Sequence, residues 1–466
     1  QTHCSARTDM RLRVARRASA RLAAVATPRA PILAGLRSAQ PLQPPMLLPR
    51  LQSTQPRSQR GERGALFADL KRCRRREDVA RLEARLQPLR DTKEWTQLIL
   101  AHARVGDRRR AFGILDEMRQ AGCEPDVFSY NILVNMCARS KDSKTAVSLL
   151  REMPGAGVQP NEVSYNAAIS ACEKAGRCNG ALSLLREMPD AGLSPDVISY
   201  SAAISACEKA GRCDEALSLF DEMFAAGVKP DVISYSAAIS ACEKAGRWEE
   251  ALMLLREMPG AGVQPNEVSY SAAISACEKA GRCDDALSLF SKMQEDGVQP
   301  DVISYSAAIQ ACAPAQQPDE ALRLFKEALR SVEPSIVTFN AVLDAVASPQ
   351  PAIARELWLQ GCERGLYPEV EKWDSGAPML DLHDHSEGAG QTALRWWLEE
   401  RVPALQPKPD RLIVVTGWGK SRRATQVSDL RGRMEGALAA MGAPTLPSDN
   451  PGTLVVDMKA WTVERV

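Results

Sequence analysis

The sequence predicts an α-solenoid of helix-turn-helix repeats, wound as a right-handed superhelix and followed by a small α/β domain. The segment VISYSAAISACEKAGR stands at 197–212 and again, unchanged, at 232–247, so the chain repeats itself every 35 residues. A period of this length is typical of stacked helical hairpins, each of which buries its apolar face against its neighbours. From about Gly376 the period stops, and apolar runs alternate with helical patterns. Such alternation favours a small sheet with helices packed on it.

The net charge of +1 over 466 residues hides two different kinds of polypeptide. Residues 1–91 hold 20 Lys and Arg against 7 Asp and Glu, whereas residues 92–466 hold 39 against 51. Aromatic side chains make up only 5% of the chain, which argues against an aromatic-rich β-sandwich or propeller. The sequence has no apolar run of roughly 18 residues, so a membrane-spanning helix is not expected.

The first 61 residues contain eleven Arg, no Lys and a single acid, Asp9. This acid-poor, Arg-rich composition predicts an organelle transit peptide over 1–61, disordered before import. A basic arm that grips nucleic acid is the alternative. Because the chain begins with Gln1 and not with Met, we expect further residues upstream.

Six of the thirteen cysteines are spaced 35 residues apart: Cys137, Cys172, Cys207, Cys242, Cys277 and Cys312. One small apolar thiol per repeat suits the seam between close helices. Structural zinc sites combine a close pair of ligands with further Cys or His, and the cysteines show no such pairing, so the series predicts packing positions.

The period divides residues 92–369 into eight units. They are 92–126, 127–161, 162–196, 197–231, 232–266, 267–301, 302–335 and 336–369. In the 197–231 unit we predict a first helix from about Ser199 to Ala210 and a second helix with Asp214 as its N-cap. Residues 62–91 are interpreted as a degenerate helical pair or a linker, and residues 370–375 as a linker.

The units share the pattern "SYN/SYS…A..KAGR..EAL.LF.EM...G..PD". With its 35-residue period and basic leader, the chain resembles a P-class pentatricopeptide repeat protein. The resemblance covers about 92–369 and implies an organellar RNA-binding α-solenoid that needs no cofactor for binding. The related tetratricopeptide repeats have 34 residues and usually bind proteins, so a protein–protein scaffold is the alternative.

The resemblance implies that the fifth and last residues of each unit read one base. The pairs are Thr96 with Asp126, Asn131 with Asn161, Asn166 with Asp196, Ser201 with Asp231, Ser236 with Asn266, Ser271 with Asp301, Ser306 with Ser335 and Asn340 with Glu369. By the pairings of the family, this array prefers 5′-G(C/U)UGAG-3′ in single-stranded RNA. Apolar second-place residues would hold the faces of the bases. They are Phe128, Val163, Ile198, Ile233, Val268 and Ile303.

The thirteenth place of six units is basic. These residues are Arg104, Arg139, Lys174, Lys209, Lys244 and Lys279. Aligned cations suit a phosphate track, although a solvated helix face is the alternative. Residues 92–369 carry 27 basic and 38 acidic side chains, whereas nonspecific nucleic-acid binders are basic overall. We therefore expect modest affinity with strong sequence dependence. The acidic balance is also the one feature that favours the scaffold.

In the C-terminal part, the predicted strands are Met379–Leu382, Arg411–Thr416 and Thr453–Asp457, and the predicted helices are Gly388–Val402 and Val427–Met441. The motif LDLH at 380–383 ends the first strand, and the motif TGWGK at 416–420 follows the second. Residues 376–466 thereby resemble a Small MutS-Related domain. That resemblance implies nucleic-acid binding, a mostly plastid subclass with the mitochondrion as the alternative, and in some members a metal-dependent endonuclease.

The chemistry of the two motifs is consistent with this implication. Asp381 could hold a divalent cation such as Mg or Mn or orient a water, and His383 could transfer a proton. The alternative is that both residues only bond neighbouring loops. The loop residues Gly417, Trp418, Gly419 and Lys420 would approach a phosphate or stack on a base.

Overall fold

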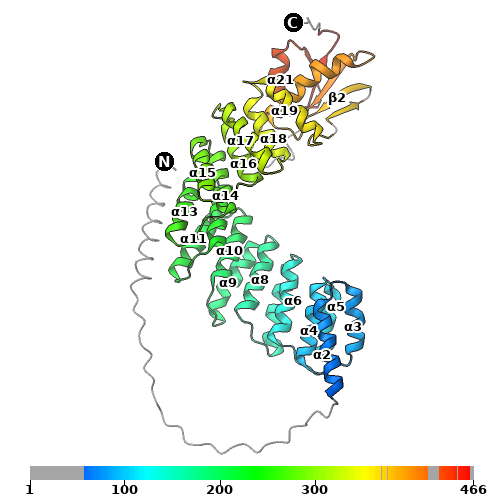
Figure 1. Ribbon diagram of the computed structural model, residues 1–466, viewed down its shortest axis with the longest axis vertical. Coiled ribbons are helices and arrows are strands. Elements are labelled where there is room, and N and C mark those ends of the chain that lie inside the picture. The colour runs from blue at the N-terminus through cyan, green and yellow to red at the C-terminus, as the bar shows by residue number, and fades with distance from the viewer. Residues whose placement is uncertain (1–56, 369, 375, 418–429, 449, 462–466) are drawn as a thin grey trace, which may run out of the picture. The chain divides into compact units, whose positions relative to one another are not determined.

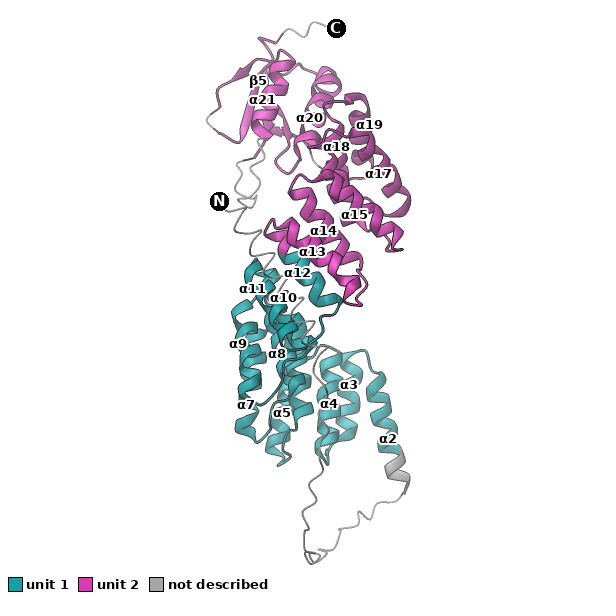
Figure 2. Ribbon diagram, turned by 90° about the vertical axis from the view of Figure 1, so that its left-hand side faces the viewer, with its two compact units in different colours: residues 1–241 teal, residues 242–466 magenta. Residues whose placement is uncertain are grey.

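The computed structural model describes residues 57–368, 370–374, 376–417, 430–448 and 450–461. Helices dominate these residues, and strands lie only in the C-terminal part of the described chain (Figure 1). The chain divides into two units, residues 1–241 and 242–466 (Figure 2). Most of the predicted transit peptide lies outside the described residues.

The first unit is a succession of antiparallel helical pairs. Its helices are α2 (Arg57–Arg72), α3 (Arg76–Leu86), α4 (Thr92–Arg104), α5 (Arg108–Gln120), α6 (Val127–Arg139), α7 (Ser143–Glu152), α8 (Glu162–Lys174), α9 (Cys178–Asp190), α10 (Val197–Lys209) and α11 (Cys213–Ala225), and α12 (Val232–Lys244) reaches its border. A 3-10 turn, Pro154–Ala156, follows α7. Helices α2 and α3 thus form a helical pair, and α2 begins at Arg57, inside the segment 1–61 that was predicted to be disordered.

Each first helix begins directly after the last residue of the preceding unit, because that residue caps it. Asp196 Oδ1 accepts a hydrogen bond from the backbone N–H of Ser199 at 2.9 Å, and the Ser199 hydroxyl accepts one from the backbone N–H of Asp196 at 3.1 Å. This reciprocal capping box satisfies two helix N-terminal donors. The predicted start of the first helix at Ser199 is therefore two residues late.

The second helices begin earlier than expected as well. Helix α11 starts at Cys213 with Arg212 at its N-cap and no side-chain cap, so Asp214 lies inside the helix and not at its N-cap. Gly211, at φ 70°, ends the preceding first helix in the left-handed conformation that glycine adopts without strain.

The cysteine series lies in the seam between helices. Cys137, Cys172 and Cys207 are at most 1% exposed. Burial, the largest effect, raises the pKa of Cys207 to about 12, so its thiol stays protonated at neutral pH. Groups of three or more His, Cys, Asp or Glu side chains able to hold a metal are absent from the described residues.

The second unit continues with helical pairs and ends in a mixed sheet. Its helices are α13 (Trp248–Gly260), α14 (Glu267–Lys279), α15 (Cys283–Glu295), α16 (Val302–Cys312), α17 (Pro318–Ser331), α18 (Ile336–Val346), α19 (Pro351–Glu363), α20 (Glu387–Trp396) and α21 (Leu430–Ala440). A π-helical turn, Trp397–Arg401, and a 3-10 turn, Val402–Ala404, extend α20 to about the predicted end. None of the described helices has the length and apolar character to cross a membrane.

The sheet has the strand order β1-β2-β3-β5-β4. The strands are β1 (Glu371–Asp374), β2 (Ala377–Asp381), β3 (Arg411–Val415), β4 (Thr445–Leu446) and β5 (Thr453–Asp457). Only β2 and β3 pair in parallel among the strands of the described residues. The predicted linker 370–375 is wrong, since β1 is an edge strand there. Its mostly exposed side chains left no apolar pattern in the sequence.

The sheet domain is docked on the last repeat through α20, which contacts both α18 and α19. In the same way α16 contacts α14 and α15, so α20 occupies the place of the first helix of a following repeat. The backbone N–H of Gly388 donates to Asp344 Oδ1 at 2.6 Å, which ties the start of α20 to α18. The domain therefore closes the end of the helical stack, as terminal capping elements do in repeat proteins.

Candidate nucleic-acid interface

The structure brings half of the eight predicted base-reading pairs into direct contact. Four pairs are hydrogen-bonded directly, with heavy-atom distances between 3.1 and 3.3 Å: Asn131 with Asn161, Asn166 with Asp196, Ser201 with Asp231, and Ser271 with Asp301. The contact follows from the cap, because the last residue of a unit begins the next first helix beside the fifth residue of its own unit. Each pair is thus a local polar site at a joint between two repeats.

Like Asp196, the predicted base-reading residues Asp231 and Asp301 have a structural role that the sequence prediction did not assign to them. Asp231 Oδ1 accepts hydrogen bonds from the backbone N–H and the hydroxyl of Ser234, at 2.9 and 2.7 Å. Asp301 Oδ1 accepts the same two bonds from Ser304, both at 2.8 Å. Asp231 and Asp301 therefore cap the following first helices, and neither lines one of the cavities described below. The base-reading role of both residues stays a prediction.

The other pairs are less regular. Thr96 reaches Asp126 through Ser129, and Ser306 reaches Ser335 through Thr338. Ser236 and Asn266 belong to different units of the chain. Asn340 accepts a hydrogen bond from the Tyr367 hydroxyl at 2.9 Å, and Glu369 lies outside the described residues.

The fifth-place side chains are less exposed to solvent than they would be in a fully open groove. From Asn131 to Ser306 they are 5–8% exposed, whereas the last residues of the units are half-buried. Burial alone would raise the pKa of Asp196, but hydrogen bonds from Ser199 and Asn166 outweigh it and lower that pKa. Asp196 is therefore an anionic acceptor at neutral pH. The last residue of each unit is the more accessible member of its pair.

The second-place side chains form the exposed apolar row of the array. They are 52–68% exposed and belong to Phe128, Val163, Ile198, Ile233, Val268 and Ile303. Val337 stands at the second place of the last unit and is 57% exposed. The sequence prediction missed this residue, although its place in the unit was the signal that could have found it. Regularly spaced exposed apolar side chains call for a partner that covers them.

One cavity combines the three kinds of predicted contact. It has a volume of about 480 Å³ and lies between α4, α6 and the start of α8. Phe128 and Val163 line it together with the pair Asn131 and Asn161. Arg104 and Arg139 line it as well. Apolar faces, a polar edge and two cations therefore surround one space.

The thirteenth-place cations are exposed but do not all have the same surroundings. Lys209 forms an ion pair with Glu173, and Lys279 forms one with Glu243, in each case the twelfth residue of the preceding repeat. The twelfth place before Lys174 is Ala138, so this neutralising neighbour is missing there. Positive charge is thus less compensated at the first repeats than further along.

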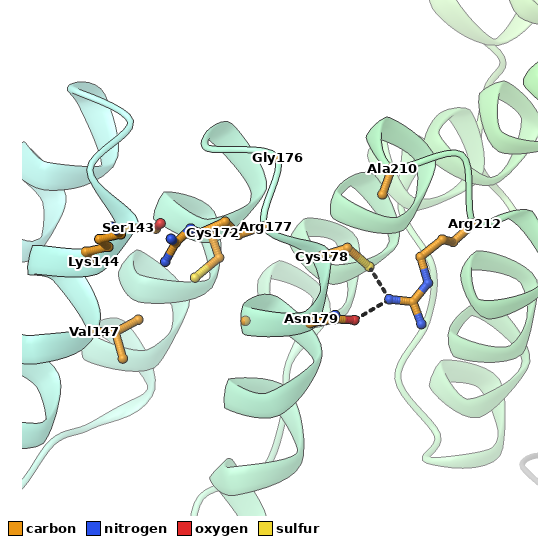
Figure 3. A pocket seen from close by; sticks show the side chains of 11 residues that line it. Ser143, Lys144, Val147, Cys172, Gly176, Arg177, Cys178, Asn179, Ala210 and Arg212 are labelled. Carbon is orange, nitrogen blue, oxygen red and sulfur yellow. Dashed lines mark hydrogen bonds between the residues drawn. The ribbon is translucent and has the colours of Figure 1, made fainter.

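A second cavity, of about 640 Å³, lies at the turns of three repeats (Figure 3). The Arg212 guanidinium lies 3.5 Å from Cys178 Sγ and also donates to Asn179 Oδ1. None of the predicted base-reading or phosphate-binding residues lines this cavity. It is therefore separate from the candidate interface.

The two C-terminal motifs meet at the carboxyl ends of the parallel strands β2 and β3. Asp381 pairs with Val415 in the sheet, and the backbone N–H of Leu382 donates to Val415 O at 2.8 Å. A Cβ on Gly417, at φ 80°, would lie 3.1 Å from His383 Cβ, so glycine lets the loop reach His383. Trp418, Gly419 and Lys420 lie outside the described residues.

Asp381 and His383 form a hydrogen-bonded pair. His383 Nδ1 lies 2.5 Å from Asp381 Oδ1, and Lys372 Nζ donates to Asp381 Oδ2 at 2.9 Å. Burial would raise the pKa of Asp381, but the bonds from His383 and Lys372 outweigh it and lower that pKa. His383 Nε2 lies 2.9 Å from Asp384 Oδ2, so a carboxylate flanks each ring nitrogen.

This donor set does not fit a divalent cation at Asp381. One carboxylate oxygen already holds the Lys372 ammonium and the other holds the imidazole. A cation would have to displace Lys372 or lie beside its positive charge, which is unfavourable. His385 belongs to the packing of the domain, because it stacks on Tyr367 and burial, the largest effect, lowers its pKa to about 4.

Comparison with known proteins identifies the repeats. Residues 73–256 match the pentacotripeptide-repeat region of PRORP, and residues 253–315 and 288–348 match the pentatricopeptide repeat domain. A pentatricopeptide repeat-containing protein of Arabidopsis thaliana is 31% identical over 122 residues. These residues are 25% of this chain and 14% of that relative, so the match spans a small part of its length.

Solved structures agree on the architecture. The pentatricopeptide repeat protein PPR10 from maize, in complex with an 18-nt psaJ RNA element, superposes with a TM-score of 0.56 at 23% identity. The match covers 70% of this chain and 48% of PPR10, and a variant of PPR10 with three cysteines replaced by serine gives the same values. This similarity shows the helical-repeat fold. Together with the family matches, it establishes that residues 73–348 consist of pentatricopeptide repeats.

Proposed function

We propose that this protein binds single-stranded RNA sequence-specifically in an organelle, in support of RNA processing, cleavage or stabilisation. The observation that carries the proposal is the 480 Å³ cavity in which Phe128, Val163, the pair Asn131 and Asn161, and two arginines converge. A base needs apolar contact on its faces and hydrogen-bonding groups at its edge, and its phosphate needs a cation. The preferred target is 5′-G(C/U)UGAG-3′.

The comparisons support this proposal at the level of fold. PPR10 was solved with an RNA element, but this chain spans 48% of PPR10, so its own target is a matter for experiment. The organelle is proposed from the composition of residues 1–61, with a plastid preferred to a mitochondrion.

A protein–protein scaffold is the competing function, and the acidic balance of residues 92–369 favours it. The exposed row favours RNA, because one apolar side chain per repeat at a constant place matches a ligand made of repeating flat units. The scaffold function would be supported by a protein partner that competes with RNA for the repeats, or by a protein partner that binds to the repeats when RNA does not.

Binding of GCUGAG-containing RNA at physiological salt, measured against a scrambled oligonucleotide, tests the proposal. We expect the target to bind more tightly, and Ser201→Asn to change the preferred fourth base from G to U. Asparagine fits this place, since Asn166 stands at the same place of the preceding repeat, where it is 8% exposed and donates a hydrogen bond to Asp196. Ser205→Asn, on the same helix but outside the pair, is the control and should leave the preference unchanged. Equal affinities for target and scrambled RNA would refute sequence-specific binding.

The hydrogen-bonded pair of Asp381 and His383 favours a second activity, cleavage of the bound RNA by the C-terminal domain. In this proposal Asp381 orients the His383 imidazole, which transfers a proton at Nε2. A noncatalytic clamp is the alternative, because the resemblance to a fold does not establish activity.

Asp381→Asn should abolish cleavage of a cognate RNA by the full chain, since the neutral amide no longer holds the imidazolium that forms on proton transfer. Gel-resolved cleavage with and without a chelator measures this loss and any requirement for a divalent cation. Asp410→Asn is the matched control, because Asp410 is exposed and forms an ion pair with Lys459. Unchanged cleavage by Asp381→Asn would remove the role of this residue.

A further inference from the structure

Most first helices of the array end in a cation, and the structure extends this series by one helical pair. The final residues of successive first helices from α2 to α14 are Arg72, Arg104, Arg139, Lys174, Lys209, Lys244 and Lys279. Arg72 does not stand at a 35-residue spacing from Arg104, so the sequence period did not include it. The helical pair of α2 and α3 therefore continues the row of cations.

The cations are densest at this end. Lys71, Arg72, Cys73, Arg74 and Arg104 line a cavity of about 440 Å³. We name Lys71, Arg72, Arg74 and Arg104 the entry cluster. Arg104 also lines the 480 Å³ cavity beside Phe128, so one guanidinium is shared by the two spaces.

The backbone around the entry cluster is held in place. Arg76 Nη2 donates to Gly106 O at 2.7 Å, which ties the α2–α3 turn to the α4–α5 turn. Arg104 Nη1 donates to Lys71 O at 3.3 Å. These bonds occupy only part of the donors that the arginine side chains carry.

Two carboxylates, Asp69 and Asp78, lie near the entry cluster, and after burial, the largest effect, their charges raise the pKa of Cys73. Arg72 lies 3.9 Å from Asp69, and both side chains are largely exposed, so that pair is weak. Within the described part of the chain, Lys71 and Arg74 form no ion pair, in contrast to Lys209 and Lys279 with their glutamates. The entry cluster therefore keeps positive charge at the end of an array that is acidic overall.

We infer that the entry cluster binds phosphate groups of the RNA strand segment that precedes the first base-reading repeat. This inference rests on the proposed function, because the strand must lie in the groove to continue past Arg104. Arginine binds phosphate through two parallel hydrogen bonds, and such contacts attract and position a strand without reading its bases. The entry cluster would thus supply the electrostatic attraction that the acidic repeats lack.

The test compares three oligonucleotides with the full chain: the GCUGAG core, the core with three added nucleotides on its 5′ side, and the core with three on its 3′ side. We expect the 5′ extension to tighten binding by roughly tenfold at low salt and the 3′ extension to lack this cluster-dependent gain. Uncharged methylphosphonate linkages in the 5′ extension should remove the gain. A gain that survives them would overturn the inference, because it would come from the bases.

Lys71→Gln combined with Arg74→Gln should cancel the gain. It should also make the negative slope of log K against log salt shallower by about 1.4, since each of the two lost single-strand phosphate contacts contributes about 0.7. Arg75→Gln combined with Arg81→Gln removes the same charge from exposed residues that do not line the cavity and should keep the gain. If both double variants lost the gain in affinity equally, the gain would depend only on net charge, and the inference would be overturned.

The two proposals fail separately. Discrimination between target and scrambled cores without a gain from the 5′ extension would overturn the entry cluster and leave the proposed function standing. A gain from the extension without discrimination between cores would support the entry cluster and overturn sequence-specific recognition.

Discussion

Replacement of both Phe128 and Val163 with alanine should weaken binding of GCUGAG RNA by about 10- to 100-fold. Stacking of a base on a protein side chain contributes about 1–3 kcal/mol, and about 1.4 kcal/mol corresponds to a factor of ten in affinity. The two residues come from neighbouring first helices and line one cavity, so we expect the variant to remove the apolar contact on both faces of a single base. Titration of labelled RNA at constant salt measures the effect.

The stability of this variant should change little, because Phe128 and Val163 are 68% and 53% exposed. Substitutions of exposed side chains usually alter the free energy of unfolding by less than about 0.5 kcal/mol. Ile353→Ala is the matched control, since Ile353 is an exposed apolar residue on the second helix α19. Unchanged RNA affinity in the double variant, or an equal loss in the control, would contradict the base-binding cavity.

Gly388→Ala should destabilise the C-terminal domain by about 2–3 kcal/mol. A Cβ on Gly388 would lie 2.4 Å from Leu343 O and 2.5 Å from Asp344 Cα. Both are backbone atoms of α18, so neither can turn aside as a side chain would, and α20 must move away. The move would also break the hydrogen bond from the Gly388 N–H to Asp344.

Urea unfolding followed by tryptophan fluorescence measures this loss, because the ring centroids of Trp358 and Trp396 lie 6.2 Å apart at the same junction. Gly436→Ala is the control: a Cβ there meets nothing within 4 Å, and alanine favours a helix over glycine by up to about 1 kcal/mol. Target discrimination by the repeats should survive in Gly388→Ala, since repeats are stabilised by their nearest neighbours. An unfolding midpoint equal to that of the unsubstituted chain would contradict the close docking of α20 on α18.

Much of the fold follows from patterns within one repeat. The Asp or Asn and the Ser three residues later form the caps, glycines such as Gly211 end the first helices, and a cysteine per repeat lies in the seam. The exposed second-place row was also predictable from its constant place in the unit. These features depend on neighbours in the chain, which the period of the sequence displays directly.

The last residues of the units show how one position can serve two roles. Asp231 and Asp301 were predicted only as base-reading residues, although each stands three residues before a serine at the start of a helix. That spacing was the signal for the caps that the structure shows at both residues. Their share in base recognition depends on what the cap leaves accessible, which the spacing does not reveal.

Features that arise only when separate helices or strands come together were not predictable in this way. Examples are the burial of the fifth-place side chains, the ion pair of Lys209 with Glu173, and the bond from Lys372 to Asp381. The mostly exposed strand β1 was missed because it carries no apolar alternation.

The amino-acid sequence by itself determined the repeat, the glycines that end the first helices and the place of each candidate contact, because hydrogen bonds and side-chain periodicity within a helical hairpin act over a few residues. Only the tertiary structure decided which of these side chains remain accessible and charged, because that depends on how closely one hairpin packs on the next. The cavity at Phe128 and the entry cluster arise from that packing.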